Sequence, residues 1–276
     1  MISLKKEFFF LCIITNFTPF RSVFSSSLSK DPINRNIAIN YAIKKKFDLI
    51  LFLDSDIIPS HNIVLNHIKA HKKYNNFVGI GGPVKPSFKL QKFNLWEFLD
   101  GKLSWFQCIN TNSDVIVKSP YHIPTCNVSF KVSYLKKFKI RFNKNLFTGE
   151  DAQFFNDLRK KKLDSVLSHK CNVKHKDRTS FINFFFHHMQ WGKHQYYTLY
   201  QKHFPKKMFY IYNMLFIFLY PLIFIFVAAI QTFYVAIPWI KINKLNFFLS
   251  PFFFIIHFFK SIWTYYESFK FKYIFK

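Results

Sequence analysis

Cysteine is scarce in this chain, and its spacing excludes two classes of site. The 276 residues include four cysteines, Cys12, Cys108, Cys126 and Cys171, none of them closely paired. Zinc sites and disulfide frameworks both need paired or repeated cysteine spacings. We therefore expect neither, and we expect reduced thiols in a cytosolic setting.

Acidic residues are also few. The sequence has 14 Asp and Glu against 40 Lys and Arg, and its formal net charge is +26. Such charge suits either nucleic acid or an anionic membrane surface. The lysines are scattered along the chain and form no arginine-rich block. We therefore interpret the charge as membrane-facing and expect no specific nucleic-acid partner.

Glycine is rare, and its one cluster is not a phosphate-binding loop. The six glycines include Gly79, Gly81 and Gly82, in the stretch Gly-Ile-Gly-Gly-Pro. A phosphate loop continues with Lys-Ser/Thr and a helix, and this stretch does neither. The sequence predicts a tight turn here.

Residues 31–56 hold a helix, a strand and two carboxylates in succession. Asp31 suits the cap of a helix and Pro32 its first position. The apolar residues Ile37, Ala38, Tyr41 and Ala42 fall on one helical face.

The apolar run 49–53 then predicts a strand covered on both faces, as in a parallel sheet. Asp54 and Asp56 follow it directly, and ligands of open α/β sheets bind where strands end. Two carboxylates there need a positive partner, such as a hard cation carrying a diphosphate. Alternatively, they cap the next helix, which is expected to begin near Ser60.

These residues resemble a known family. The helix Arg-Asn-x-Ala-x-Asn (35–40), followed by an apolar strand ending Leu-Asp-Ser-Asp, resembles the inverting glycosyltransferases of family 2, which have the GT-A fold. The resemblance implies a three-layer α/β domain. It also implies that Asp54 and Asp56 bind Mg²⁺ or Mn²⁺ and, with Arg35, the diphosphate of a nucleotide sugar.

A second stretch, residues 123–131, matches the family in placing Asn127 before a short strand and a helix at 132–138. The resemblance implies that Asn127 lines the donor-sugar pocket. The alternative is an asparagine at a strand edge that bonds to its own backbone.

A third stretch begins at Thr148-Gly149 and leads through Glu150 and Asp151 into a helix. Acids in a first turn often only complement the helix dipole. The resemblance implies more: Asp151 is the general base that deprotonates the acceptor hydroxyl, and Glu150 supports it. It also implies that His175, after the strand at 173–174, completes the metal site, although a lone histidine can equally be structural.

The N-terminus is shorter than the resemblance requires. The run 8–14 predicts a buried strand, with a signal peptide as the alternative. The family's Pro-x-Tyr/Phe-Asn and Asp-rich turns are both missing, and the 30 residues before Asp31 are too few for two βα units. We expect an incomplete nucleotide-binding half.

The C-terminal part predicts a membrane anchor. No charged residue occurs from Phe209 to Ile240, longer than the ~20 residues that cross a bilayer. We predict an anchor at 201–276 with one or two transmembrane helices, at 209–230 and 246–266. Basic flanks place both ends in the cytoplasm. Buried helices of a soluble core are the alternative.

Together these observations predict a GT-A-like domain at 1–200, truncated at its N-terminus, on a membrane anchor. The expected protein is a hexosyltransferase of the cell membrane, with its catalytic domain in the cytoplasm. It would act in polysaccharide biosynthesis, moving a sugar from a nucleotide-diphosphate sugar to a lipid-linked or cell-envelope glycan acceptor. Two alternatives stay open: a catalytically inactive remnant or glycan- or lipid-binding subunit, and a basic membrane protein whose acids are helix caps.

Overall fold

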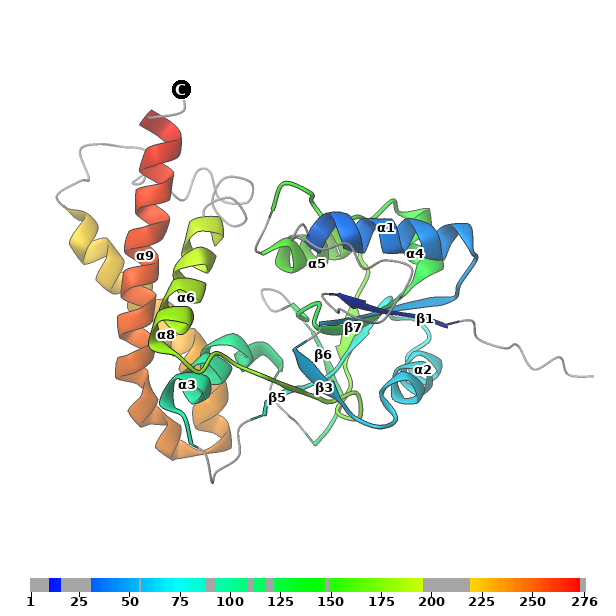
Figure 1. The fold of residues 1–276 in the computed structure, drawn as a ribbon, viewed down its shortest axis with the longest axis horizontal. Coiled ribbons are helices and arrows are strands. Elements are labelled where there is room, and N and C mark those ends of the chain that lie inside the picture. Colours follow the sequence, from blue (N-terminus) through cyan, green and yellow to red (C-terminus); the bar gives the residue numbers. More distant parts are fainter. Residues whose placement is uncertain are drawn as a thin grey trace, which may run out of the picture. The chain divides into compact units, whose positions relative to one another are not determined.

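A computed structural model describes residues 10–15, 31–54, 56–87, 93–108, 112–117, 122–146, 149–195 and 219–273 (Figure 1). The chain divides into two compact units. The sheet unit comprises residues 1–87 and 110–176, and the helical unit comprises residues 88–109 and 177–276. This division differs from the predicted boundary at residue 200, because two segments earlier in the chain pack with the C-terminal helices.

The sheet unit contains a six-stranded mixed sheet. Its order is β1-β2-β7-β4-β8-β6. The strands are β1 (Phe10–Thr15), β2 (Leu49–Asp54), β4 (Gly79–Gly81), β6 (Val115–Ile116), β7 (Asn127–Lys131) and β8 (Ser165–Leu167). β1 is parallel to β2, and β4 to β8, whereas β7 is antiparallel to both of its neighbours. The apolar run 8–14 therefore contributes a strand, as predicted, but the sheet is mixed.

A second sheet of three short strands has the order β3-β9-β5. Its strands are β3 (Ile57–Pro59), β5 (Val84–Pro86) and β9 (Val173–His175). Around the larger sheet, α1 (Asp31–Lys44), α4 (Val132–Lys137) and α5 (Glu150–Lys160) cover one face, and α2 (Ile63–Lys73) covers the other (Figure 1). The predicted α/β class is confirmed at this level.

Strand β2 is the centre of the core. Its residues 49–53 are at most 4% exposed, as the unbroken apolar run predicts. The Phe52 ring meets those of Phe130 and Phe142 edge-on. Asp54 is the last residue of β2, so the two carboxylates do follow a buried strand.

The inward face of α1 differs by one position from the predicted one. Ile37 is 43% exposed, whereas Ala38, Ile39 and Ala42 are buried. The reason is Arg35, which is itself buried and sets an i, i+3, i+4, i+7 face with those three residues.

The helix expected near Ser60 is α2, and its inward face carries polar residues. The helix begins at Ile63 and buries Ile63, His67, Ala70 and His71. Leu65 is 45% exposed. Two histidines occupy the buried face because polar groups of β7 receive them.

Gly79 and Gly81 lie in strand β4 and not in a tight turn. A Cβ at Gly79 would stand 2.6 Å from Ser165 Oγ, and one at Gly81 would stand 2.2 Å from an Ile123 methyl carbon. The glycines therefore serve close packing between strands.

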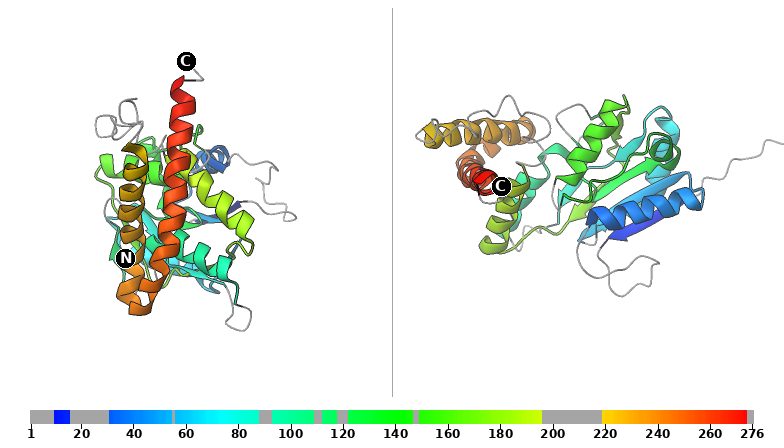
Figure 2. Two further views of the ribbon diagram at one scale, coloured as in Figure 1. Left: turned by 90° about the vertical axis from the view of Figure 1, so that its left-hand side faces the viewer. Right: turned by 90° about the horizontal axis from the view of Figure 1, so that it is seen from above.

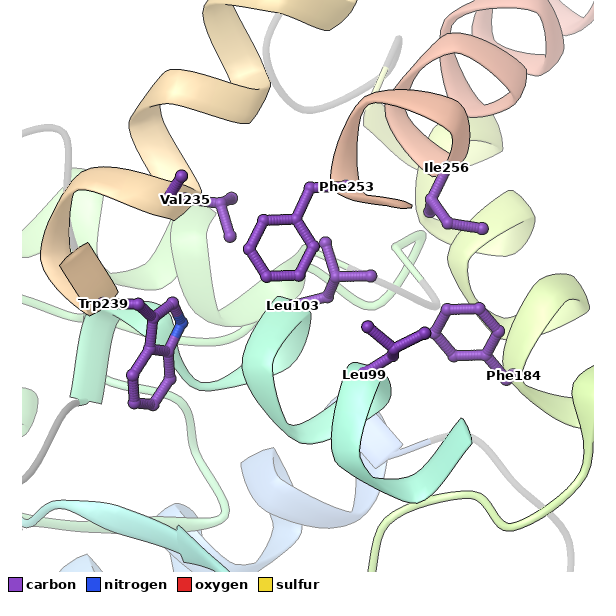
Figure 3. Close-up of a cluster of buried hydrophobic side chains, with 8 residues drawn as sticks. Leu99, Leu103, Phe184, Val235, Trp239, Phe253 and Ile256 are labelled. Carbon is purple, nitrogen blue, oxygen red and sulfur yellow. The ribbon is translucent and has the colours of Figure 1, made fainter. Parts of the chain in front are cut away.

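The helical unit has one hydrophobic core. Its elements are α3 (Leu95–Ser104), η2 (Phe106–Cys108), α6 (Phe181–Gln195), α8 (Tyr220–Ile242), η5 (Lys244–Leu249) and α9 (Ser250–Tyr273). Side chains from α3, α6, α8 and α9 meet in a buried cluster of Leu99, Leu103, Phe184, Val235, Ala236, Trp239, Phe253 and Ile256 (Figure 3). Trp96 and Phe98 pack against this cluster.

Helices α8 and α9 lie side by side (Figure 2). Residues 220–242 and 244–266 form two helices long and apolar enough to cross a membrane, by length and composition. Each carries an exposed apolar stripe: Leu222, Phe226, Ile230, Phe233 and Ile237 on α8, and Phe252, Ile255, Phe259, Ile262 and Tyr266 on α9.

The first apolar helix differs from the predicted span at 209–230. It continues to Ile242 with Pro238 inside it, and residues 201–218, including the predicted start, lie outside the described residues. The second agrees closely with the predicted 246–266.

Candidate active site

Arg35 joins two of the predicted motifs. Its Nη2 lies 3.5 Å from Asp54 Oδ1, and its Nη1 donates to Glu150 Oε1 at 2.6 Å. The three groups come from α1, the end of β2 and the start of α5. A nearly buried guanidinium is favourable only with such charged partners. The phenyl ring of Phe142, 5.6 Å from the guanidinium carbon, covers it further.

Asp56 and His175 form a second pair. The distance from Asp56 Oδ2 to His175 Nε2 is 3.3 Å. Strand pairing produces it, since Ile57 of β3 is opposite His175 of β9 and Lys176 N donates to Asp56 O. The imidazole is buried while the carboxylate is half exposed. Asp56 and His175, two of the three predicted metal ligands, therefore lie together.

Asp151 stands in the first turn of α5, after Gly149 in the left-handed region at φ 74°. Its Oδ1 accepts a hydrogen bond from Ala152 N at 2.8 Å. The same oxygen lies 3.6 Å from Nε2 of His122, a residue that the sequence did not single out. Its separation of 29 positions from Asp151 gives no local pattern that would reveal the pair.

The carboxylate of Glu150 is strongly perturbed. Burial raises the pKa of Glu150 to about 7, the charge of Asp151 adds to this, and Arg35 opposes it. Burial has the opposite effect on His122: it lowers the pKa of the imidazole, and the charge of Asp151 opposes this by raising it. Groups with shifted pKa values that gather at the end of a strand are typical of functional sites.

Asn127 lies in a different environment from the one predicted. It is fully buried; its Nδ2 donates to Cys171 O at 2.6 Å, and its Oδ1 lies 3.1 Å from His67 Nε2. Ser129 Oγ lies 2.8 Å from His67 Nδ1 and 2.9 Å from His71 Nε2. Its donor-pocket role stays a prediction, and in this structure it belongs to a polar network inside the sheet unit.

The hydrogen bonds fix the direction of part of that network. Because Asn127 donates through Nδ2, its Oδ1 accepts and His67 Nε2 carries a proton. Ser129 Oγ, which both histidines approach, donates to Ile80 O at 3.3 Å. Burial lowers the pKa of His67 to about 4 and that of His71 to about 3, so both are neutral at pH 7.

The fit to a divalent cation is partial. Among the described residues, which omit Ser55 between the two aspartates, no group of three or more His, Cys, Asp or Glu could hold a metal. Asp54, Asp56 and His175 offer two carboxylates and one imidazole at a strand end. Mg²⁺ is commonly held by one or two carboxylates plus substrate phosphates. The residues thus suit a cation that arrives with a diphosphate better than a preformed cage.

Comparisons with known proteins leave the family open. No protein-family model matches the chain, and no curated protein does. The solved structure of A197 from STIV aligns at 16% identity and TM-score 0.30, over 54% of this chain and 76% of that one. S. aureus TarS aligns at 11% identity and TM-score 0.33, over 87% of this chain and 42% of that one. Similarity at these values shows neither a shared fold nor a shared activity.

Proposed function

We propose that this chain is a membrane-anchored glycosyltransferase of the hexosyltransferase type. It transfers a sugar, with inversion, from a nucleotide-diphosphate sugar to a hydroxyl of a lipid-linked or cell-envelope glycan. One observation carries the proposal. Arg35 contacts both Asp54 and Glu150, so the helix, the aspartate motif and the Glu-Asp motif, which lie up to 115 residues apart, converge on one place.

On the donor side, the diphosphate is held beside Asp54 and Asp56, with His175 next to Asp56. A divalent cation bound there would offset the charge of the leaving diphosphate. Arg35 balances part of the carboxylate charge and orients Asp54 toward the strand end. Asn127, if its amide turned from the buried network, would be the sugar contact that the resemblance implies.

On the acceptor side, Asp151 takes the hydroxyl proton while the acceptor oxygen attacks the anomeric carbon. The bond from that carbon to the diphosphate breaks, and the diphosphate leaves with the electron pair. Attack opposite the leaving group inverts the configuration. Glu150 and Arg35 fix the start of α5, and hence the position of Asp151.

The exposed apolar stripes on α8 and α9 support the membrane anchor, since soluble surfaces rarely carry such extended apolar patches. The basic flanks of the anchor favour a cytoplasmic catalytic domain at the cell membrane. A lipid-linked or envelope acceptor fits that location.

The experiment uses the full-length protein in detergent with a panel of UDP-, GDP- and dTDP-hexoses and octyl glycosides as acceptors, and it measures release of nucleoside diphosphate. Asp151→Asn keeps the size of the side chain but removes the base, so we expect turnover to fall by roughly 10²–10⁴-fold. Asp157→Asn, the same change on the outer part of α5, is the matched control and should stay near wild type.

Calorimetry with Mn²⁺ and UDP separates the donor site from the base. Asp54→Ala should lose binding, whereas Asp151→Asn should keep it. Transfer by Asp151→Asn at the wild-type rate would make Asp151 a helix cap and would refute the mechanism.

A further inference from the structure

His122 is the one charged or titratable neighbour of Asp151 that comes from outside α5 among the ion pairs of the described residues. It lies in the segment that leads into β7, and its ring stands 6.4 Å from that of Phe155. The His122 and Asp151 side chains are 18% and 20% exposed. Both are thus sheltered yet open to solvent at one edge.

The two contacts described for the Asp151 carboxylate fall on the same oxygen, Oδ1. The Ala152 N–H binds Oδ1 at 2.8 Å, and the His122 Nε2 faces the same oxygen at 3.6 Å. One hydrogen bond and one imidazole contact on the same carboxylate oxygen restrict the orientation of the group. The acceptor hydroxyl would then be met by the second oxygen, Oδ2.

We propose that His122 is a positioning residue for the general base: its Nε2–H holds Asp151 Oδ1 so that Oδ2 addresses the acceptor hydroxyl. This inference rests on the proposed function and adds a residue to that site. His122 keeps its own proton throughout, and the proton of the acceptor goes to Asp151.

The surroundings suit a neutral donor. Asp151 and Arg159, both in α5, are charged groups that act on His122. Burial lowers the pKa of His122, Asp151 raises it and Arg159 lowers it further. A neutral imidazole carries one N–H donor and can orient a carboxylate without transferring its proton.

Two variants separate positioning from packing. His122→Gln keeps an N–H donor, whereas His122→Phe keeps the ring beside Phe155 and removes the donor. In the nucleoside-diphosphate release assay we expect Gln to stay within about threefold of wild type in kcat/KM. We expect Phe to lose about tenfold, because the carboxylate loses the group that orients it.

A second measurement needs no turnover. In protein with isotopically labelled histidine, the NMR titration of His122 should shift to lower pH in Asp151→Asn by about one unit or more, because a nearby carboxylate raises the pKa of an imidazole. Asp157→Asn should leave the titration unchanged.

The outcomes distinguish the two proposals. The positioning role is overturned if the wild type is active and the Phe variant has an equal rate, or if the His122 titration is unchanged in Asp151→Asn. Either result leaves the glycosyltransferase proposal standing. A wild type that releases no nucleoside diphosphate with any donor overturns the proposed function, and the positioning role falls with it.

Discussion

The two units each bury histidine among polar groups, but the partners differ. In the sheet unit, His67 and His71 meet the hydroxyl of Ser129 and the amide of Asn127. In the helical unit, His188 Nε2 donates to Asp100 Oδ1 at 3.0 Å. The first cluster is neutral throughout, and the second contains a fully buried carboxylate.

Arg178 is a further partner of Asp100: its N and Nη1 both lie 3.0 Å from Oδ2. Burial raises the pKa of Asp100, but the His188 hydrogen bond and the charges of His188 and Arg178 lower it more, so the net pKa lies below its usual range. Burial also lowers the pKa of His188, while the hydrogen bond and the charge of Asp100 raise it. The comparison teaches that a carboxylate partner offsets part of the effect of burial on a histidine pKa, an offset that the neutral partners of His67 and His71 provide less strongly.

The largest effect is expected from breaking the ionic cluster. Asp100→Asn leaves the Arg178 guanidinium without its carboxylate, and losing one partner of a buried pair costs about 3–5 kcal/mol. The lower end applies here because Arg178 is about one-third exposed. Hydrogen exchange measured by mass spectrometry should show faster exchange in α3 and α6. Asp157→Asn is the control, and equal protection in the two variants would contradict the ionic role.

The second-largest effect is expected from lowering the pH, which should destabilise the His67 cluster more than the Asp100 cluster. Burial lowers the pKa of His67 from its usual 6.5 to about 4, so its contribution to stability is complete above pH 6.5 and is lost as pH falls toward 4. A shift of this size corresponds to about 3 kcal/mol. Exchange in α2 and β7 should therefore accelerate between pH 6.5 and 4.5, while α3 and α6 change less. The double variant His67→Gln/His71→Gln should flatten the acid response of α2, and an undiminished response would place the sensitivity elsewhere.

The smallest expected effect is a difference in stability between two serine variants, one in each cluster. Ser129→Ala removes the hydroxyl that His67 and His71 share, and a buried group left without a partner costs about 1–3 kcal/mol. Ser104→Ala removes only a 3.4 Å contact to Asp100 Oδ1, and it should cost less than about 1 kcal/mol. Thermal unfolding of the two variants in one detergent measures the contrast. The reverse order of melting temperatures would contradict the role of the hydroxyl shared by His67 and His71.

Much of the sheet unit was predictable because its signals are local. The run 49–53, the aspartate at its end and the helix beginning at Glu150 follow from apolar periodicity and capping residues. The buried polar contacts were not predictable, because they join residues that no spacing rule connects. The resemblance assigned Arg35 to the diphosphate but gave no link to Glu150, and no sequence pattern connected His67 with Ser129.

The extent of the helical unit was also not predictable, because it depends on contacts between segments that are far apart in the sequence. The hydrophobic face of α3 identifies a buried helix but not the helices that bury it. Its partners, among them Trp239 and Phe253, come from the apolar segments that the sequence marked as a membrane anchor. Apolar composition alone does not tell which face of such a helix meets protein.

The placement of α3 has a consequence for synthesis of the chain. Trp239 Nε1 donates to the Lys102 carbonyl across 137 positions, so α3 leaves the ribosome long before α8 exists. At ~5–20 residues per second, that interval is on the order of 10 s. During it, Leu99 and Leu103 have no cover from the late helices. Chains that stop before α8 should therefore aggregate or bind chaperones, even though their sheet unit is complete.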